Sequence, residues 1–444
     1  MRYIYLDNFR GFSNALIPLL NVTFCVGENS TGKTSFLTVV KLLSSHKFWF
    51  DQTFDPSITS AKHFNDYVSV GSSSRLSFRI GIVDSKILGE QGSKEGEGSR
   101  VRGFLFEFVE KDGIPSLASV TTNFETNFLT VYFKGASVRY RTASFGKDVQ
   151  AADFENGLFD QWKLHQKNRG MKGAMIVKDD ALKMGYAPPL YALSAAAREA
   201  FGSKGVEGRN RSVLSFPAPP FDSEAAWIAP IRSKPRRTYD EVNLEFTPEG
   251  THSPYLIKKL LVGGSQSIEF EKFLKKFGKE SGLFKEVRVH RFGKSVTSPF
   301  ELEIVLESKP LNMGNVGYGV SQSLPVAVEM FARREGTLFA IQQPEVHLHP
   351  RAQASIGELI FNMAAAEKKE FIIETHSDFT LDRYRCAQRD SKKKVGSQVL
   401  FFDRVDGVNI ATPIEIDGDG ELSLNQPKKY REFFVKENLK IIGI

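Results

Sequence analysis

Eight consecutive residues constrain the fold of this chain more than any other segment. They are Gly27, Glu28, Asn29, Ser30, Thr31, Gly32, Lys33 and Thr34. They match the pattern G-x-x-x-x-G-K-[ST] and lie between the apolar run NVTFCV and the run SFLTVVKLL, which has a helical period. The glycines let successive backbone N–H groups turn inward, and the positive end of the following helix faces the same point. A glycine turn kept for structural reasons alone would not need the lysine and threonine, so the octet predicts a polyphosphate site.

Two side chains of the octet have predicted roles in this site. The Lys33 ammonium reaches the β- and γ-phosphate oxygens, and the Thr34 hydroxyl binds Mg²⁺. We therefore expect a nucleoside triphosphate and Mg²⁺ as cofactors.

The composition is that of an ordinary globular protein, with 444 residues of which 41% are hydrophobic and 25% charged. The length suits about three domains, or one large α/β unit with an insertion. A formal net charge of +7 permits contact with nucleic acid without requiring it. Cys25 and Cys386 are the only cysteines, which excludes a zinc knuckle and a disulfide scaffold. The sequence has no signal peptide and no apolar stretch of membrane-spanning length, so we expect a cytoplasmic protein that does not contact the membrane.

The region from residue 1 to 146 begins with two apolar runs around a turn. Tyr3–Leu6 alternates, Val22–Val26 is a second, mainly apolar run, and Ser35–Leu43 has a helical period. We interpret these segments as strand, strand, loop and helix. If the first two strands pair, Arg10 in the intervening turn lies near the phosphate loop, although an ordinary surface arginine is an equal alternative.

The next segments change from strand to helix patterns. Ser69–Val83 and Val101–Arg141 alternate, which suits an antiparallel sheet with one solvent-exposed face. Gly89–Arg100 is poor in apolar residues and is expected to be a mobile loop. Residues 147–215 are interpreted as a helical insertion that ends in a linker. Its helical patterns cover Asp153–Gln166 and Leu190–Ala200.

The region from 216 to 444 returns to alternating elements. A helix is predicted over Ile268–Gly278, followed by a strand pair, Phe284–Phe292 and Phe300–Glu307. From Asn315 onward helix and strand patterns alternate. The sequence contains no internal repeat and no heptad run long enough for a coiled coil.

Three motifs in this region accompany the phosphate loop. VGYGVSQ, residues 316–322, opens the helical run SLPVAVEMF. The strand run LFAI leads into QQPEVHLHP, residues 342–350, and the strand run FII leads into ETHSD, residues 374–378. Strands that end in polar residues, one of them a histidine, are the layout of an ATPase.

NFRGF, GENSTGKT, VGYGVSQSLP, IQQPEVHLHP and ETHSD occur in this order. Together they resemble the ABC-type ATPase heads of the OLD and RecF group, including anti-phage defence ATPases of the PARIS, Septu and retron-associated kinds. The similarity covers the chain except the insertion. It implies an α/β fold with a mixed P-loop sheet and an antiparallel β subdomain. Residues 1–146 and 216–444 would be the two ATPase lobes, 147–215 the helical insertion, and ATP the nucleotide.

The resemblance assigns roles to further residues. GYGVSQ corresponds to the ABC signature, so Gly319, Ser321 and Gln322 would contact the γ-phosphate of ATP held by a second subunit. An open helix start also attracts anions, although a plain helix cap is the alternative. His376 resembles the switch histidine that contacts the γ-phosphate, and Arg10 occupies the position of an arginine that approaches nucleotide.

The chain departs from the family at the acidic pair that binds Mg²⁺ and polarises the attacking water. Gln342 and Gln343 occupy both positions. An amide oxygen can accept a hydrogen bond from metal-bound water, but it cannot take a proton from the nucleophile. We expect an ATPase whose hydrolysis is slow or absent. Glutamine at 343 is common in such heads, so residue 342 is the unusual one. It is explained either by an engineered Glu→Gln change made to trap the ATP-bound form or by natural decay.

Other groupings of polar residues allow alternative interpretations. Glu345 could supply the missing carboxylate, or Glu345, His347 and His349 could bind zinc or manganese from one face of an extended segment. By the resemblance, this segment is instead a loop that crosses a dimer interface. Asp417–Glu421 is similar to a calcium loop but lacks the ligand spacing, so a hairpin turn is preferred.

Two functions follow from these assignments. In the first, ATP between two copies closes a homodimer or higher oligomer that controls a separately encoded TOPRIM or HNH nuclease, or a toxin, in anti-phage defence. A phage-derived trigger would contact the insertion. In the second, the chain is a DNA-binding ATPase of repair or recombination, which basic clusters such as Lys234–Arg237 and Lys392–Lys394 would serve. Such clusters are also common on solvated surfaces.

Overall fold

The computed structural model describes residues 1–52, 54, 59, 61–71, 76–84, 102–124, 127–134, 137–144, 173–179, 188–207, 221, 224–240, 243–263, 265–295 and 297–432. The predicted helix at 153–166, the predicted loop at 89–100 and most of the insertion lie outside these residues. The chain packs into two compact units. Unit 1 comprises Met1–Leu19, Asn29–Glu224 and Asp403–Ala411, and unit 2 comprises Leu20–Glu28, Ala225–Phe402 and Thr412–Ile444. Each unit therefore combines separate stretches of chain, unlike the consecutive regions predicted from the sequence.

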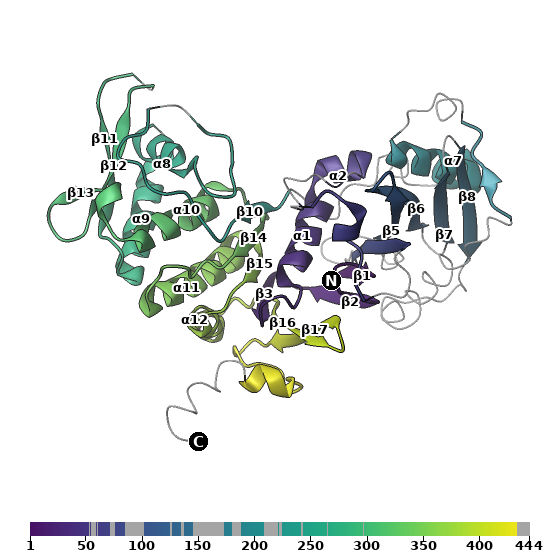
Figure 1. The fold of residues 1–444 in the computed structure, drawn as a ribbon. Coiled ribbons are helices and arrows are strands. Elements are labelled where there is room, and N and C mark those ends of the chain that lie inside the picture. Colours follow the sequence, from purple (N-terminus) through teal and green to yellow (C-terminus); the bar gives the residue numbers. More distant parts are fainter. Residues whose placement is uncertain are drawn as a thin grey trace. The chain divides into compact units, whose positions relative to one another are not determined.

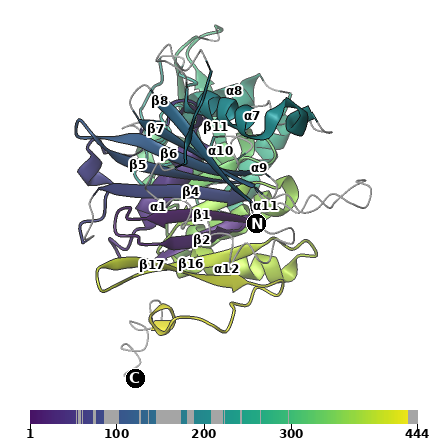
Figure 2. The same cartoon turned by 90° about the vertical axis from the view of Figure 1, so that its right-hand side faces the viewer.

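Unit 1 contains an antiparallel sheet with the strand order β2-β1-β4-β5-β6-β7-β8-β9. Its strands are β1 Arg2–Asp7, β2 Ala15–Leu19, β4 Ser77–Asp84, β5 Arg102–Lys111, β6 Ile114–Phe124, β7 Asn127–Lys134, β8 Ser137–Ser144 and β9 Met175–Ile176. Figure 2 shows β4, β1 and β2 side by side, in agreement with their registers. This sheet is the predicted antiparallel subdomain.

Aromatic side chains form much of the core of unit 1, which accounts for many of the 37 phenylalanines in the chain. Phe48 and Trp49 pack edge-on against Phe106, and Phe78 stacks on Phe108. A separate cluster that includes Tyr3 and Tyr5 packs on Leu105 and Phe128. The prediction of one solvent-exposed face is wrong for β4 and the centre of β5, because these strands are buried on both faces. In β4 even the polar side chains of Ser77 and Arg79 are buried, and Arg79 forms ion pairs with Asp7 and Glu107.

The helices of unit 1 include α1 Lys33–Ser44, α2 His46–Asp51 and α7 Pro189–Glu207. Helix α1 matches the predicted helix after the phosphate loop. Helix α7 contains the predicted segment Leu190–Ala200 and begins with proline, whose fixed φ suits the first helical position.

Unit 2 is built around a second sheet with the order β10-β14-β15-β3-β16-β17. Its strands are β3 Val22–Gly27, β10 Ala226–Ile228, β14 Leu338–Gln342, β15 Glu370–Glu374, β16 Ser397–Val405 and β17 Val408–Ile416. The last residues of β16 and the first of β17 belong to the stretch Asp403–Ala411 of unit 1. The first five strands in this order pair in parallel. The central strand β3 is buried along its whole length, as expected for a parallel sheet. The predicted α/β class with a separate antiparallel subdomain is thus confirmed.

Helices of unit 2 cover this sheet (Figure 1). They are α8 Ser253–Val262, α9 Ser267–Ser281, α10 Tyr318–Ala332, α11 Pro350–Glu367 and α12 Asp378–Asp390. A small antiparallel sheet, β11 Glu286–Arg291, β12 Phe300–Val305 and β13 Pro310–Asn312, contains the predicted strand pair. Their apolar residues join β3, β14 and β15 in one core.

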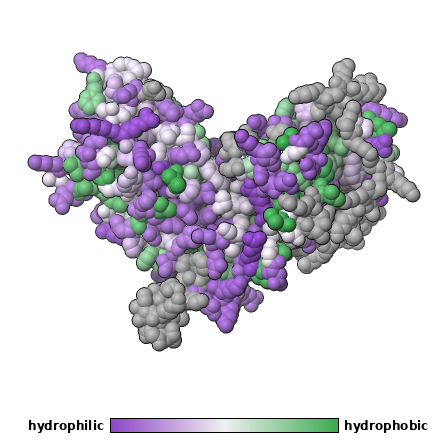
Figure 3. Space-filling model, in the orientation of Figure 1, coloured by the Kyte–Doolittle hydropathy of each residue, from purple (hydrophilic) through white to green (hydrophobic). Residues whose placement is uncertain are grey.

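No helix in the described part of the chain is both long and apolar enough to cross a membrane. On the face shown in Figure 3, hydrophobic residues form small separate patches among hydrophilic ones.

Candidate functional site

The phosphate loop connects β3 to α1, and its backbone has the conformation that the motif requires. Gly27, Ser30 and Gly32 all have positive φ, at 146°, 63° and 101°. A Cβ atom built on Gly27 would lie 2.1 Å from the carbonyl oxygen of Phe402, and one on Gly32 would lie 2.6 Å from Phe12 Cζ. Only glycine meets both demands, conformational and steric, at these two positions.

The start of α1 is built to receive an anion. Gly32 is its N-cap and contributes no side-chain cap, and the first turn contains no acidic residue. Helices usually place a capping oxygen or a carboxylate there. Lys33 opens the helix and is 3% exposed, whereas Thr34 is exposed. The positive end of the helix and the lysine favour a negatively charged ligand at this point.

Arg10 lies in a turn that packs against the phosphate loop, but the contact does not arise from the strand pairing that was expected. β1 pairs with β2 and β4 and not with β3, so the strand pairing assumed for Arg10 is wrong. The contact is made by Phe12, against Gly32. The Arg10 guanidinium donates to the carbonyl oxygens of Asp66 and Thr59, both at 3.1 Å. Its proposed contact with nucleotide stays a prediction.

The signature residues begin α10. Ser321 and Gln322 are buried, and Ser321 Oγ donates to the Tyr318 carbonyl oxygen at 2.9 Å. Gly319 packs closely, since a Cβ atom there would lie 3.2 Å from the carbonyl oxygen of His347. Tyr318, at the open start of the helix, is 52% exposed. Solvent therefore reaches this segment at Tyr318 and in part at Gly319, whereas Ser321 and Gln322 are buried.

Gln342 and Gln343 end strand β14. Gln342 faces Glu374 across the parallel pairing of β14 and β15, and its Nε2 donates to Glu374 Oε2 at 2.9 Å. Gln343 has a φ of 42°, and its N–H donates to the Glu374 carbonyl oxygen at 2.7 Å. The carboxyl ends of parallel strands are the usual place for ligands in an α/β sheet. A carboxylate is therefore present beside position 342, on the neighbouring strand.

Glu345 is fixed by the switch segment. Its Oε1 accepts a hydrogen bond of 2.7 Å from the backbone N–H of His376, whose side chain is exposed. Burial raises the pKa of Glu345, and the hydrogen bond from His376 acts against this rise. The sequence did not predict this contact between the two motifs.

The alternative of a zinc or manganese site at Glu345, His347 and His349 is not supported. The segment turns instead of extending, with Leu348 N–H donating to the Glu345 carbonyl oxygen and a φ of 63° at His347. The His349 side chain caps α11. Within the described ranges, no group of three metal-binding side chains occurs. Asp417–Glu421 forms the expected tight turn, in which Asp417 Oδ1 accepts the N–H groups of Asp419 and Glu421.

Arg232 is a site residue that the sequence analysis missed. It is 3% exposed, and its Nη2 donates to the carbonyl oxygens of Gln342 and Gln343 at 3.2 and 3.4 Å. Its backbone N–H donates to Gln322 Oε1 at 3.3 Å. The sequence places Arg232 two residues before the basic cluster Lys234–Arg237, which was assigned to the surface or to DNA.

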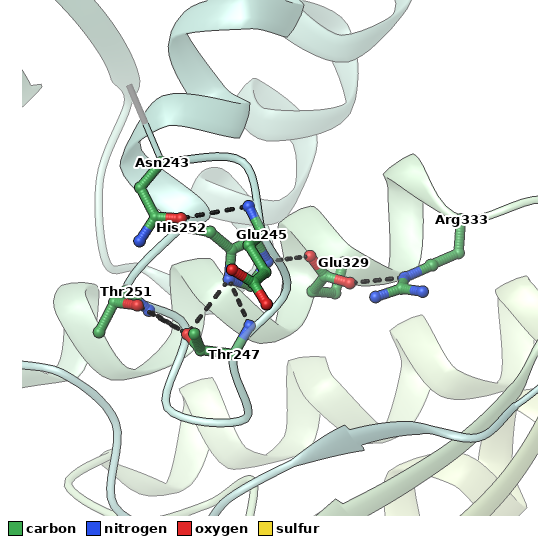
Figure 4. A network of polar contacts seen from close by, with 7 residues as sticks. All are labelled: Asn243, Glu245, Thr247, Thr251, His252, Glu329 and Arg333. Atoms are coloured by element: carbon green, nitrogen blue, oxygen red, sulfur yellow. Dashed lines mark hydrogen bonds and ion pairs between the residues drawn. The ribbon is translucent and has the colours of Figure 1, made fainter. Parts of the chain in front are cut away.

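A second polar network anchors the far end of α10 (Figure 4). His252 and Glu329 are both buried and meet at 2.6 Å, and Arg333 Nε donates to the other carboxylate oxygen at 2.8 Å. The backbone N–H of Thr247 donates to His252 Nδ1, which leaves Nε2 as the donor to Glu329. Burial would raise the pKa of Glu329, but the contacts with His252 and Arg333 hold it below its ordinary value.

Two protein-family models match parts of the chain. Residues 1–129, which include the phosphate loop, match the family described as "AAA ATPase domain". Residues 290–382, which include the three other motifs, match "AAA domain, putative AbiEii toxin, Type IV TA system". Both matched stretches are thus similar to AAA ATPase domains. A comparison with curated protein sequences finds no significant match.

Solved structures of SMC heads align with most of the chain. The SmcHead bound to the C-winged helix domain of ScpA has a TM-score of 0.45 at 10% identity and covers 93% of this chain and 98% of that one. The Pyrococcus furiosus Smc head with an extended coiled coil, bound to the C-terminal domain of ScpA, has a TM-score of 0.39 at 11% identity and covers 100% and 99%. The Thermotoga maritima SMC head has 0.37 at 13% identity and covers 94% and 100%. Similarity at this level does not indicate a shared activity or partner.

Proposed function

We propose that the chain binds ATP with Mg²⁺ at the loop Gly27–Thr34 and that the bound ATP closes a homodimer or higher oligomer. The observation that carries this proposal is the start of α1, where an uncapped helix without acidic residues presents Lys33 beside a glycine-rich turn. The second contact to the γ-phosphate would come from the first turn of α10 in another copy. ATP would then favour the closed state because it contacts both copies only there.

The chain offers oxygen ligands that suit Mg²⁺. By the resemblance, these are the Thr34 hydroxyl in the loop and the Gln342 side-chain oxygen at the end of β14. Mg²⁺ would neutralise the charge of the β- and γ-phosphates. Because neither Gln342 nor Gln343 can accept a proton, hydrolysis by this chain would be slow. Slow hydrolysis would prolong the closed state.

The output of closure would be a separately encoded effector, a nuclease or toxin, in anti-phage defence. The motifs shared with defence ATPases support this assignment.

The test is to measure ATP binding with Mg²⁺ by calorimetry and the mass of the chain by light scattering, with and without ATP. We expect binding and a rise in mass. Binding without any rise in mass would contradict ATP-gated assembly, and absence of binding would contradict the whole proposal. Strong, salt-dependent binding of DNA by the chain would instead support the alternative of a DNA-binding ATPase.

A further inference from the structure

We infer that Arg232 is a positioning residue that couples the signature helix α10 to the turn after β14. The inference rests on the proposed function, because α10 is expected to contact the γ-phosphate and the turn after β14 is expected to lie at Mg²⁺. It concerns contacts within unit 2 alone.

Arg232 meets both segments directly. Through its backbone N–H it donates to Gln322 on α10, and through Nη2 it donates to two successive carbonyl oxygens, those of Gln342 and Gln343. Two successive carbonyl groups can point toward one cation here because Gln343 has a φ of 42°, which turns the backbone out of the strand direction. Such a conformation is unfavourable for a side chain other than glycine and needs surrounding contacts to hold it.

The same turn is tied to the switch segment. Gln343 N–H donates to the Glu374 carbonyl oxygen, and His376 N–H donates to Glu345 Oε1. A shift of α10 at Gln322 would therefore pass through Arg232 to the turn, and from the turn to His376. All three motifs of unit 2 that the resemblance assigns to the γ-phosphate, Mg²⁺ or the attacking water are joined by this chain of contacts.

The burial of Arg232 lowers the stability of the fold, so a role in packing alone does not explain an arginine at this position. Its guanidinium is buried, and Nε and Nη1 have no hydrogen-bond partner among the described residues, nor does Glu345 Oε2. Burial lowers the pKa of Arg232 to about 10, and the charge of Glu345 acts in the opposite direction. The side chain thus stays charged at neutral pH. Buried donors that lack partners destabilise the fold, and an apolar residue of similar length would avoid that cost.

The test compares Arg232→Met with Arg232→Lys in the full chain, with Arg237→Met as the matched control on the same segment. Arg237 is exposed, so its loss removes the same charge without these contacts. Three quantities are measured: the Tm without ATP, the affinity for ATP with Mg²⁺ below the assembly concentration, and the ATP-dependent rise in mass. We expect the affinity of Arg232→Met for ATP to lie within about threefold of wild type. Its assembly should be about 10- to 100-fold weaker, because the charge-assisted hydrogen bonds of the guanidinium are lost. Arg237→Met should behave as wild type.

The lysine variant keeps the test decisive if the methionine variant fails to fold. Lysine retains the charge but cannot reproduce the planar fork, so a folded Arg232→Lys chain should bind ATP normally and assemble more weakly than wild type. A folded variant of either kind that assembles as tightly as Arg237→Met overturns the inference. A wild-type chain that does not assemble with ATP contradicts the proposed function before any variant is compared.

A second variant tests the link to α10. Gln322→Met removes the oxygen that accepts the Arg232 N–H, and the double variant with Arg232→Lys completes a cycle. If both residues act through one connection, the double variant should assemble as strongly as the single variant with the larger loss of assembly. Additive losses would show that Gln322 and Arg232 act separately and would overturn the coupling.

Discussion

Gln342 Nε2 donates to Glu374 Oε2 at 2.9 Å, across the last register pair of β14 and β15. Both residues are nearly buried, at 8% and 6% exposed. A neutral amide donor beside a carboxylate is a satisfied pair. A carboxyl group at position 342 would not form a satisfied pair with Glu374. Two carboxyl groups at this distance cannot both ionise unless a cation lies between them.

The stability of the variant Gln342→Glu should therefore depend on Mg²⁺ or on a proton that one of the two carboxyl groups keeps. In the absence of Mg²⁺, one of the two carboxyl groups should keep its proton above the ordinary glutamate pKa of about 4.3. The folded state then binds more protons than the unfolded state, so the Tm of the variant should fall as the pH rises from about 4.3 to neutral. Mg²⁺ should restore the Tm at neutral pH and raise ATP turnover by about 10- to 100-fold over wild type.

The control for this prediction is the double variant Gln342→Glu, Glu374→Gln. It restores one carboxylate facing one amide, so its Tm should lose the additional pH dependence. A Tm of Gln342→Glu that does not change with pH would show that the two side chains separate in the variant.

Lys33→Ala should abolish most ATP binding while leaving the fold intact. Lys33 is the one basic side chain in the first turn of α1, and a charge-assisted contact to phosphate is worth at least about tenfold in affinity. Lys41→Ala, in the last turn of the same helix, is the matched control. Equal ATP affinities of the two variants, measured by calorimetry, would remove Lys33 from the site.

Gly27→Ala should destabilise the chain, since the new methyl group would meet a backbone oxygen, that of Phe402, and φ at this position is 146°. A cost of about 1–3 kcal/mol is typical of a strained backbone position. Gly71→Ala serves as the control, because no atom lies within 4 Å of its added Cβ and its φ is not positive. Thermal unfolding of the two variants should differ in Tm, and equal values would mean that β3 and β16 adjust freely.

Glu329→Gln should change how stability depends on pH. The pKa of Glu329 in the folded chain lies below its ordinary value of 4.5, so its contribution is present above that pH and is lost as the pH falls through the lower, folded value. The variant should be less stable at neutral pH by about 1–3 kcal/mol and should lose less stability on acidification. Glu335→Gln, an exposed glutamate beyond the end of α10, is the control and should have a Tm close to wild type at every pH. A Glu329→Gln chain that follows the control would contradict the assigned network.

The sequence predicted the features that depend on local patterns. The phosphate loop, the helix after it, the alternating strands of unit 1 and the helix at Ser267–Ser281 all follow from periods and glycine positions within a few residues. Strand β2 was missed because it contains Pro18, which weakens a strand pattern, and β10 was missed because three residues are too few to show a period.

The contacts that define the candidate site depend on register and could not be predicted in this way. Glu374 faces Gln342 only because β14 and β15 pair in parallel with one particular alignment, and Arg232 reaches the same turn from a segment more than a hundred positions earlier. In the sequence, Arg232 was indistinguishable from the neighbouring surface arginines, since no local pattern reports the burial of a lone cation.

Because each unit is made of separate stretches of the chain, truncated fragments are unsuitable for assigning functions to parts of the protein. The chain passes from one unit to the other at 19/20, 28/29, 224/225, 402/403 and 411/412, so no single cut yields a whole unit. A fragment that ends at residue 224 would carry β3 without the strands that pair with it, and a fragment that starts at 225 would lack its central strand. A loss of activity in such fragments would reflect misfolding and would not identify functional residues. Functional residues are therefore better identified by point variants in the full chain.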